Sequence, residues 1–149
     1  MIKKINHNNI IVSKKLWRLF QESYKVEADL LEVVDFPPLR REVEDFVASN
    51  NIFYVYLKDD YICGAIELFI SGNVIHIQSL VVSPDYFRKK IGFSLVNFVF
   101  SLVGYSFVTV ETGVDNIPAV SLYKKVGFLE LEQFDTDHGV RKIKFKKYL

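Results

Sequence analysis

Three consecutive cations, Arg88 to Lys90, lie between the end of an apolar strand and a segment that can form a helix. Pro84 ends the strand because proline offers no N–H group to a β-ladder. The first N–H groups of a helix lack partners and carry the positive end of its dipole, and the three side chains add full charges. Gly92 allows a ligand to approach the backbone without meeting a Cβ. This order predicts an anion site, with a solvated basic turn as the alternative.

A second segment, residues 116–128, follows one strand later and reads Asn-Ile-Pro-Ala-Val-Ser-Leu-Tyr-Lys-Lys-Val-Gly-Phe. The two segments together resemble the acetyl-CoA-binding signature of the GNAT family of N-acetyltransferases. That signature is V-x-P-x-x-(Q/R)-x-x-G-x-(G/A), followed later by N-x-x-A-x-x-L-Y-x-x-x-G-F. The second element fits at every position, and the first keeps Val82, Pro84, Ile91 and Gly92 in register.

Two positions depart from the first element of the signature. Phe87 stands in the Gln/Arg position, and Lys90 stands in the position of the first glycine. The charge of Lys90 would help to hold a pyrophosphate if the side chain points outward, whereas an inward side chain would block the approach to the backbone. The two departures therefore bear on the affinity for the coenzyme.

The resemblance implies acetyl-CoA as cosubstrate, held where the strand ending at Val82 separates from a strand beginning near Ser106. Backbone amides left unpaired there would bind the peptide-like pantetheine arm, because buried polar groups require partners. The pyrophosphate would lie on the basic loop and the following helix N-terminus. The residues that the resemblance assigns to the coenzyme are Leu80, Val81, Val82, Arg88, Lys89, Lys90, Ile91, Gly92, Phe93, Asn116, Ala119 and Tyr123.

Tyr123 matches the family position whose phenol lies near the coenzyme sulfur. An amine attacks the thioester, and the departing thiolate needs a proton. A tyrosine with an ordinary pKa of about 10 can donate that proton. The resemblance therefore implies a general acid, and the alternative is a tyrosine of the core. A backbone N–H group in the Leu80–Val82 segment is the expected donor to the oxyanion.

A general base is harder to find in the sequence. Many relatives place a carboxylate six residues before the proline, and here that position is Gln78, which cannot accept the proton. Glu111 and Glu67 are the candidate substitutes, and a water chain ending at backbone carbonyls is a further alternative. His76, on a strand face, is expected to be a packed or surface histidine.

In this family the first two helices and their connection border the acceptor site. Here the connection carries acidic residues, of which Glu27 and Asp35 are assigned with Phe36 to acceptor binding. Negative charge at this rim would favour a cationic amine, within the screening length of about 8–10 Å. A solvated acidic loop is the alternative.

The composition predicts one soluble, folded domain over residues 1–149, because half of the residues are hydrophobic. The net charge of +1 argues against general attraction to nucleic acid or membranes. Cys63, the single cysteine, cannot form an intrachain disulfide, and no metal-ligand spacing is present. The first residues have no apolar secretory core, so a cytoplasmic protein is expected. Residues 91–110 carry no charge, but Gly104 divides them, which favours a buried helix and strand over a membrane span.

Hydrophobic periodicity and turn residues predict the element order strand, two helices, three-strand meander, helix, strand, helix and hairpin. Ser13 is the expected N-cap of the first helix. The predicted strands are residues 2–6, 52–57, 61–70, 74–82, 106–112, 128–134 and 140–148, and the predicted helices are 13–26, 39–48, 89–103 and 116–126. This order indicates an α+β fold, and the resemblance implies the GNAT fold, with a mixed, mostly antiparallel sheet of about seven strands and about four helices.

The function expected from the resemblance is direct transfer of an acetyl group from acetyl-CoA to a primary amine, without a metal. A non-catalytic CoA-binding or interaction module on the same fold is the alternative. A homodimer is also possible, as dimers are common in this family.

Overall fold

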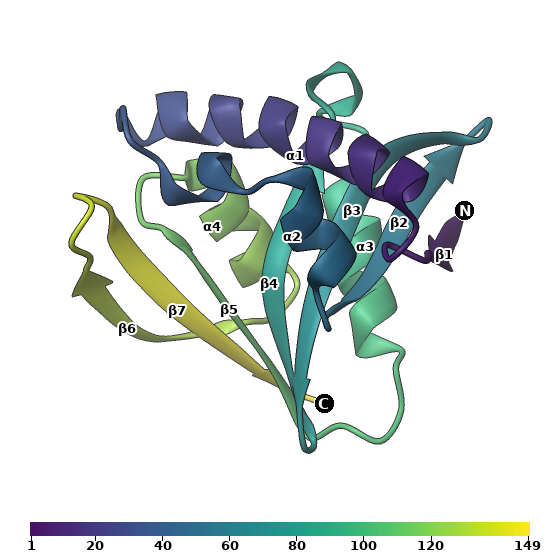
Figure 1. Cartoon of the computed structure of the whole chain (residues 1–149). Helices are drawn as coiled ribbons and strands as arrows, with labels where there is room; N and C mark the ends of the chain where they lie inside the picture. Colours follow the sequence, from purple (N-terminus) through teal and green to yellow (C-terminus); the bar gives the residue numbers. More distant parts are fainter.

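A computed structural model describes residues 1–149. One sheet of seven strands, in the order β1-β2-β3-β4-β5-β7-β6, runs through the molecule (Figure 1). The strands are β1 (Ile2–Lys4), β2 (Ile52–Lys58), β3 (Tyr61–Ser71), β4 (Val74–Val82), β5 (Phe107–Gly113), β6 (Leu129–Asp135) and β7 (Arg141–Tyr148). The helices are α1 (Ile10–Leu30), α2 (Val43–Ala48), α3 (Ile91–Phe100) and α4 (Ile117–Lys125), with short 3-10 turns at Pro37–Arg40 and Pro84–Tyr86.

Only the pair β4–β5 of this sheet is parallel, and the other neighbouring strands are antiparallel. The parallel pair arises because α3 connects the two strands as a crossover, whereas β2, β3 and β4 follow one another through tight turns. The predicted α+β class and the mixed, mostly antiparallel sheet are therefore confirmed.

Helices cover both faces of the sheet, and alternate residues of one strand reach the two cores. Ala65 packs with Leu16, Phe20 and Phe46 from α1 and α2, while its neighbour Ile66 belongs to the core formed with α3. This alternation follows from the two-residue period of a strand. Because β3 is buried on both faces, it reads as a nearly continuous apolar run in the sequence.

The start of the first helix differs from the prediction. Asn9 is the N-cap, and its side chain accepts from the N–H groups of Ile11 and Val12. Ser13 instead lies inside the helix, fully buried, and its hydroxyl donates to the carbonyl of His7. Both residues are good caps, and the packing of the preceding segment decided between them.

The second helix is shorter than predicted because a 3-10 turn occupies its first part. The pair Pro37–Pro38 starts this turn, which ends at Arg40. Glu42 and Asp45 then form a reciprocal capping box, so α2 begins at Val43 rather than at Leu39.

The uncharged span 91–110 forms α3 and the first part of β5, as predicted. Gly104 adopts a φ of 92° between them, which glycine allows at low cost. None of the helices has the length and apolar character needed to cross a membrane.

Candidate functional site

Strands β4 and β5 separate halfway along their length, and the candidate site is built around this gap. Their ladder contains four residue pairs and ends at Ile77–Val110. Beyond that pair the two strands diverge, so that the sheet opens into a V below α1 and α4 (Figure 1). Both halves retain their outer partners, since β4 pairs with β3 and β5 pairs with β7 along the gap.

The edge of β4 in the gap presents backbone groups without strand partners. The Ser83 N–H group donates to the Cys63 carbonyl, which makes this pair a hydrogen-bonded one. Pair types alternate along an antiparallel ladder, so the backbone groups of Leu80 and Val82 point away from β3 and into the gap. Gln78 is the extra residue of a β-bulge, since Ser79 pairs with Glu67 and Ile77 with Leu68.

A cavity of about 640 Å³, here called the loop cavity, lies beside the edge of β4 and the basic loop. Apolar side chains of α1, β4 and α4 form its walls, and cations lie at its rim. Its lining comprises Ser23, Val26, Glu27, Leu30, Leu80, Val82, Tyr86, Phe87, Arg88, Lys90, Ile91, Gly92, Phe93, Asn116, Pro118, Ala119, Leu122 and Lys125. An apolar groove with a cationic end suits a long ligand with an anionic group at one end.

The basic loop is folded so that its backbone N–H groups are free. From Arg88 to Phe93 no backbone N–H group has a hydrogen-bond acceptor, and the first bond of the following helix joins the Ser94 N–H to the Lys90 carbonyl. Arg88 and Lys90 adopt left-handed φ values of 63° and 61°, and such alternation directs successive N–H groups into one concavity. Together with the dipole of α3, this concavity is suited to a phosphate group.

The positive φ of Lys90 predicts that glycine is better at this position. The variant Lys90→Gly should unfold at a higher urea concentration, with a gain of about 1 kcal/mol, because a side chain is strained in this conformation. Lys89→Gly is the matched control, since it removes the same charge where φ is not positive. Equal stability of the two variants would contradict a strained backbone at Lys90.

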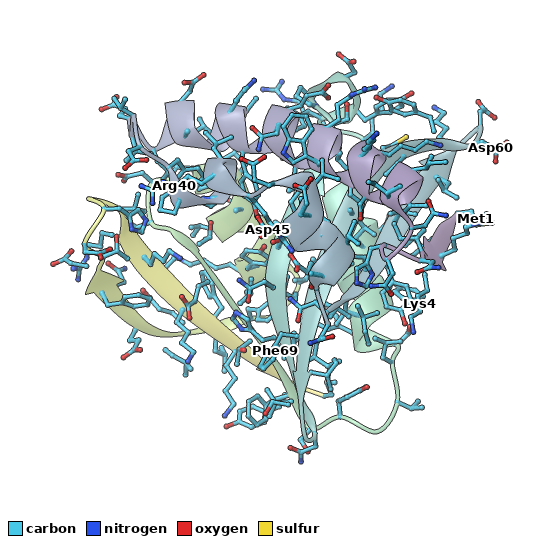
Figure 2. The ribbon with its side chains drawn as sticks, viewed as in Figure 1. Met1, Lys4, Arg40, Asp45, Asp60 and Phe69 are labelled. Atoms are coloured by element: carbon cyan, nitrogen blue, oxygen red, sulfur yellow. The ribbon has the colours of Figure 1, made fainter.

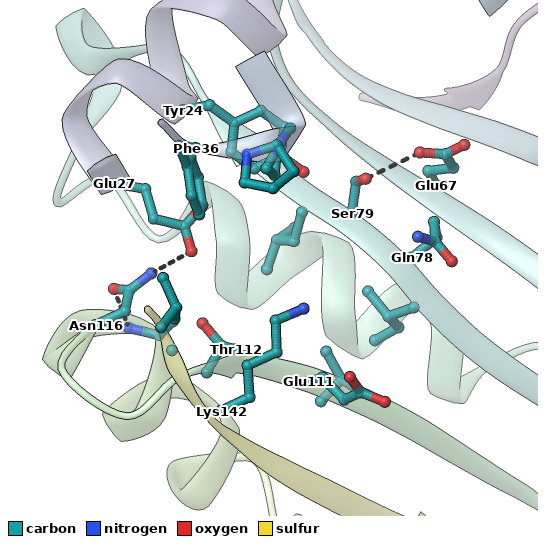
Figure 3. Close-up of a pocket in the computed structure, with 18 of the residues that line it drawn as sticks. Tyr24, Glu27, Phe36, Glu67, Gln78, Ser79, Glu111, Thr112, Asn116 and Lys142 are labelled. Atoms are coloured by element: carbon teal, nitrogen blue, oxygen red, sulfur yellow. Dashed lines mark hydrogen bonds between the residues drawn. The ribbon is translucent and has the colours of Figure 1, made fainter. Parts of the chain in front are cut away.

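A second cavity of about 630 Å³, here called the sheet cavity, is lined by the ends of β4, β5 and β7 together with α1 and residues 36–41. Four residues, Glu27, Leu80, Asn116 and Ala119, line both cavities, so the two cavities meet at the gap. Arg40 and Asp45 both line the sheet cavity, and they lie on the face of the molecule that Figure 2 presents. Figure 3 shows side chains that line this cavity, among them Glu27, Glu111 and Lys142.

Tyr123 from α4 lines the sheet cavity. Its ring is 4% exposed and packs edge-to-face against Phe128, with the centroids 5.5 Å apart. Burial is the main cause that raises the pKa of the Tyr123 phenol, and the nearby Glu27 carboxyl adds to it. The phenol therefore keeps its proton throughout the neutral range, which is the state that a proton donor requires.

Glu27 connects the end of α1 to the start of α4 across the gap. Its carboxyl accepts a hydrogen bond of 3.0 Å from the Asn116 side-chain amide (Figure 3), and the Asn116 oxygen caps α4 by accepting from the Ala119 N–H group. Burial raises the pKa of Glu27, while the Asn116 amide and the charge of Lys142 act in the opposite direction. Such a carboxyl in a cleft is a candidate proton acceptor.

The raised pKa of Glu27 predicts a pH-dependent effect on stability. Between its ordinary pKa and the raised folded pKa, the folded protein binds more protons than the unfolded chain, so stability falls as the pH rises. The variant Glu27→Gln keeps a side-chain oxygen that can accept the hydrogen bond from Asn116. It has no carboxyl to ionise, so it should not lose stability as the pH rises. The variant should therefore melt higher than the wild type at about pH 8 and no higher at about pH 4. The exposed Glu22→Gln serves as control, and a pH-independent difference would contradict the raised pKa.

Glu67 is placed in a structural ion pair, which corrects its prediction as a substitute base. It is fully buried, and its oxygens accept bonds of 2.7 Å from both terminal nitrogens of Arg41 and of 2.9 Å from Asn51 and Ser79. Burial alone would raise the pKa of Glu67, but the bonds and charge of Arg41 outweigh it and lower the pKa. A carboxylate with four donors is poorly suited to accept a proton.

The other predicted base, Glu111, lies on β5 and lines the sheet cavity, and its role stays a prediction.

His76 is half-buried and bonds to Thr109 at 2.8 Å, and burial lowers its pKa, so it is a packed histidine as expected. In the structure no cluster of His, Cys, Asp or Glu has the arrangement needed for a metal ion. Cys63 is buried.

The structure brings most of the predicted coenzyme residues together. The loop cavity contains Leu80, Val82, Arg88, Lys90, Ile91, Gly92, Phe93, Asn116 and Ala119. Val81, Lys89 and Tyr123 do not line it. Val81 points into the core beneath α1, because successive strand residues face opposite sides, and the Lys89 ammonium lies 5.2 Å from the Tyr86 ring centre. Tyr123 lines the sheet cavity only.

Of the predicted acceptor residues, Glu27 and Phe36 line the sheet cavity and Asp35 does not. Asp35 is exposed and forms an ion pair with Arg40, which lowers its pKa. The expectation of an acidic rim is therefore corrected, because Glu27 belongs to α1 and Asp35 is neutralised locally. Sequence reasoning missed Tyr24, which follows Phe20 by one helical turn, and Lys142, which belongs to the basic cluster of the last strand.

Comparison with known proteins identifies the family and the fold of the chain. Residues 13–128 match the family model described as the acetyltransferase (GNAT) family. The UPF0157 protein YqkA of Bacillus subtilis (strain 168) is 30% identical over 141 residues, which are 94% of this chain but only 41% of that protein. This chain therefore spans well under half the length of that curated relative.

Solved structures show the same fold. The ribosomal-protein-S18-alanine N-acetyltransferase from Escherichia coli superposes with a TM-score of 0.79 at 15% identity, covering 99% of this chain and 92% of that one. An aminoglycoside 6'-N-acetyltransferase complexed with coenzyme A has a TM-score of 0.73 at 17% identity, with 99% and 96% covered. The family match extends over most of the chain, and the fold is that of its members. The chain belongs to the acetyltransferase (GNAT) family.

Proposed function

We propose that the protein transfers the acetyl group of acetyl-CoA directly to a primary amine. The observation that carries this proposal is the gap between β4 and β5, where two cavities meet at a strand edge with unpaired backbone groups. The loop cavity would hold the coenzyme, and the sheet cavity would admit the amine. A thioester at the junction would be reached from the acceptor side without passing through the coenzyme groove.

The unpaired N–H groups fit the coenzyme at two places. Those from Arg88 to Phe93 would hold its pyrophosphate, with the charges of Arg88 and Lys90 close by. The N–H and C=O groups of Leu80 and Val82 would pair with the amides of the pantetheine arm, which would lie along β4 as an additional strand. Such pairing removes the cost of burying free amides.

The reaction needs one proton acceptor and one proton donor at the junction. The amine loses a proton to the Glu27 or Glu111 carboxyl, directly or through water, and its nitrogen attacks the thioester carbon. A backbone N–H group of the Leu80–Val82 edge stabilises the oxyanion. The carbon–sulfur bond then breaks, and Tyr123 gives its phenolic proton to the departing sulfur. The second proton of the attacking nitrogen, which carries a positive charge after the attack, is lost and restores the Tyr123 phenol, directly or through water.

The test compares coenzyme binding with turnover. Calorimetry would measure acetyl-CoA binding, and thiol release would be followed with a panel of primary amines and without amine. Binding with amine-dependent thiol release supports the transferase. Binding without thiol release would favour a CoA-binding module, for which the missing carboxylate at Gln78 is the motivating observation, and absence of binding would overturn both.

A further inference from the structure

The three lysines on the open face of β7 have different surroundings. Lys142, Lys144 and Lys146 alternate with the core residues Ile143 and Phe145, so they share the face opposite α4. The Lys146 ammonium lies over the aromatic rings of its neighbours, 3.9 Å from the centre of the nearer one. It is therefore satisfied by cation–π contact.

The register of the sheet then separates the two remaining lysines. Lys144 is flanked by Glu111 on β5 and Glu132 on β6, so carboxylates lie opposite it on both sides. Lys142 is flanked by Gly113 and Phe134, which offer no charge. The Lys142 side chain extends into the sheet cavity, with its ammonium pointing into the interior (Figure 3).

Most of the other charges of this cavity have partners, and Glu111 lies opposite Lys144 on β7. Arg41 is paired with Glu67, Arg40 with Asp35, and Asp45 accepts the Glu42 N–H group at the start of α2. The Glu27 carboxyl bonds to Asn116. Lys142 makes no direct ion pair with any residue of the protein, although its charge acts on the Glu27 carboxyl at longer range, and its ammonium lies in a half-enclosed space of small-molecule size.

We infer that the acceptor is a small amine that also carries a carboxylate, and that Lys142 binds this carboxylate. The inference rests on the proposed acetyl transfer and names its substrate class. With the amine at the junction beside Leu80 and Tyr123, the acceptor's other end would lie along β5 and β7, where Lys142 donates a charge-assisted hydrogen bond. A diamine or polyamine would instead place a second cation against this ammonium, at a cost in affinity.

The test uses acceptor pairs that differ only by the carboxylate: glycine with methylamine, β-alanine with ethylamine, and lysine with 1,5-diaminopentane. The wild type should show kcat/KM values about ten- to hundredfold higher for the carboxylate member. Lys142→Met should lose this preference, because kcat/KM should fall more for the carboxylate member of each pair than for its simple amine, and Lys142→Glu should favour the diamine. Lys144→Met is the matched control and should keep the wild-type pattern.

Equal use of both members by the wild type, or a preference that survives Lys142→Met, would overturn the inference. If no amine is acetylated, the proposed function fails, and a binding experiment decides the remaining question. Propionate and butyrate would be titrated into the protein loaded with coenzyme A. Binding that disappears in Lys142→Met would support the carboxylate site, whereas wild-type protein that binds neither acid would refute it.

Discussion

Replacing Tyr123 by phenylalanine should slow acetyl transfer by about 10²- to 10⁴-fold, the usual contribution of a positioned proton donor. The phenol lines the sheet cavity, where Tyr123 is almost fully buried, and it remains protonated at neutral pH because burial raises its pKa. Phenylalanine fills the same space against Phe128 and Phe145, so the fold and the coenzyme groove should be preserved. Single-turnover kinetics would measure the chemical step, and calorimetry would measure coenzyme affinity.

Two further tyrosines make this prediction specific. Tyr24 lines the same cavity from α1, and its pKa is also raised by burial, so Tyr24→Phe tests whether this phenol, rather than that of Tyr123, donates the proton. Tyr54 packs against Phe98 away from both cavities, and Tyr54→Phe should be fully active. Wild-type single-turnover rates in Tyr123→Phe would remove the assigned role from this residue.

Arg41→Ala should lower the free energy of unfolding by about 3–5 kcal/mol, the cost of leaving a buried carboxylate without its counter-charge. Glu67 is fully buried, and two of its four hydrogen bonds come from Arg41. The guanidinium also lies 4.1 Å from the centre of the Phe46 ring, so the variant loses packing as well as charge. Urea unfolding at neutral pH would measure the loss.

Two measurements separate the charge contribution of Arg41 to stability from its packing contribution: the pH dependence of unfolding and a double variant. Arg41 lowers the pKa of Glu67, so the pair contributes stability above the ordinary carboxyl pKa, and this contribution disappears as the pH falls through the folded value. The deficit of Arg41→Ala should therefore shrink in acid. Arg41→Met with Glu67→Gln should be more stable than Arg41→Ala, because no buried charge remains. A deficit below about 1 kcal/mol would place Arg41 among ordinary surface ion pairs.

Most of the fold could be predicted because local signals and tertiary packing agree. Strand alternation and turn residues identified the meander, and the order of elements gave the crossover through α3. The boundaries failed where two residues competed for one role. Asn9 and Ser13 are both good caps, and only the burial of Ser13 against the segment before α1 decides between them.

The candidate site was predicted best where the backbone itself forms it. The basic loop and the Asn116 cap follow from glycine, proline and cap chemistry, which is local in sequence. The side chains of the sheet cavity were harder to predict because their partners are remote. Glu27 meets Asn116 across 89 residues, and whether Glu67 acts as a base or as an ion-pair partner depends on Arg41. Neither contact can be recognised from a single sequence, because no local pattern of residues marks it.

The short parallel ladder has a mechanical consequence. Four residue pairs hold β1–β4 to β5–β7 within the sheet, so this seam is the natural line of local opening. A pantetheine arm bound along this seam would hold β4 and β5 together. Backbone amide protons of both strands should therefore exchange with solvent more slowly when the coenzyme is bound. Coenzyme binding would thus reduce the local opening between β4 and β5, so the acceptor would meet a more rigid cavity after the coenzyme has bound.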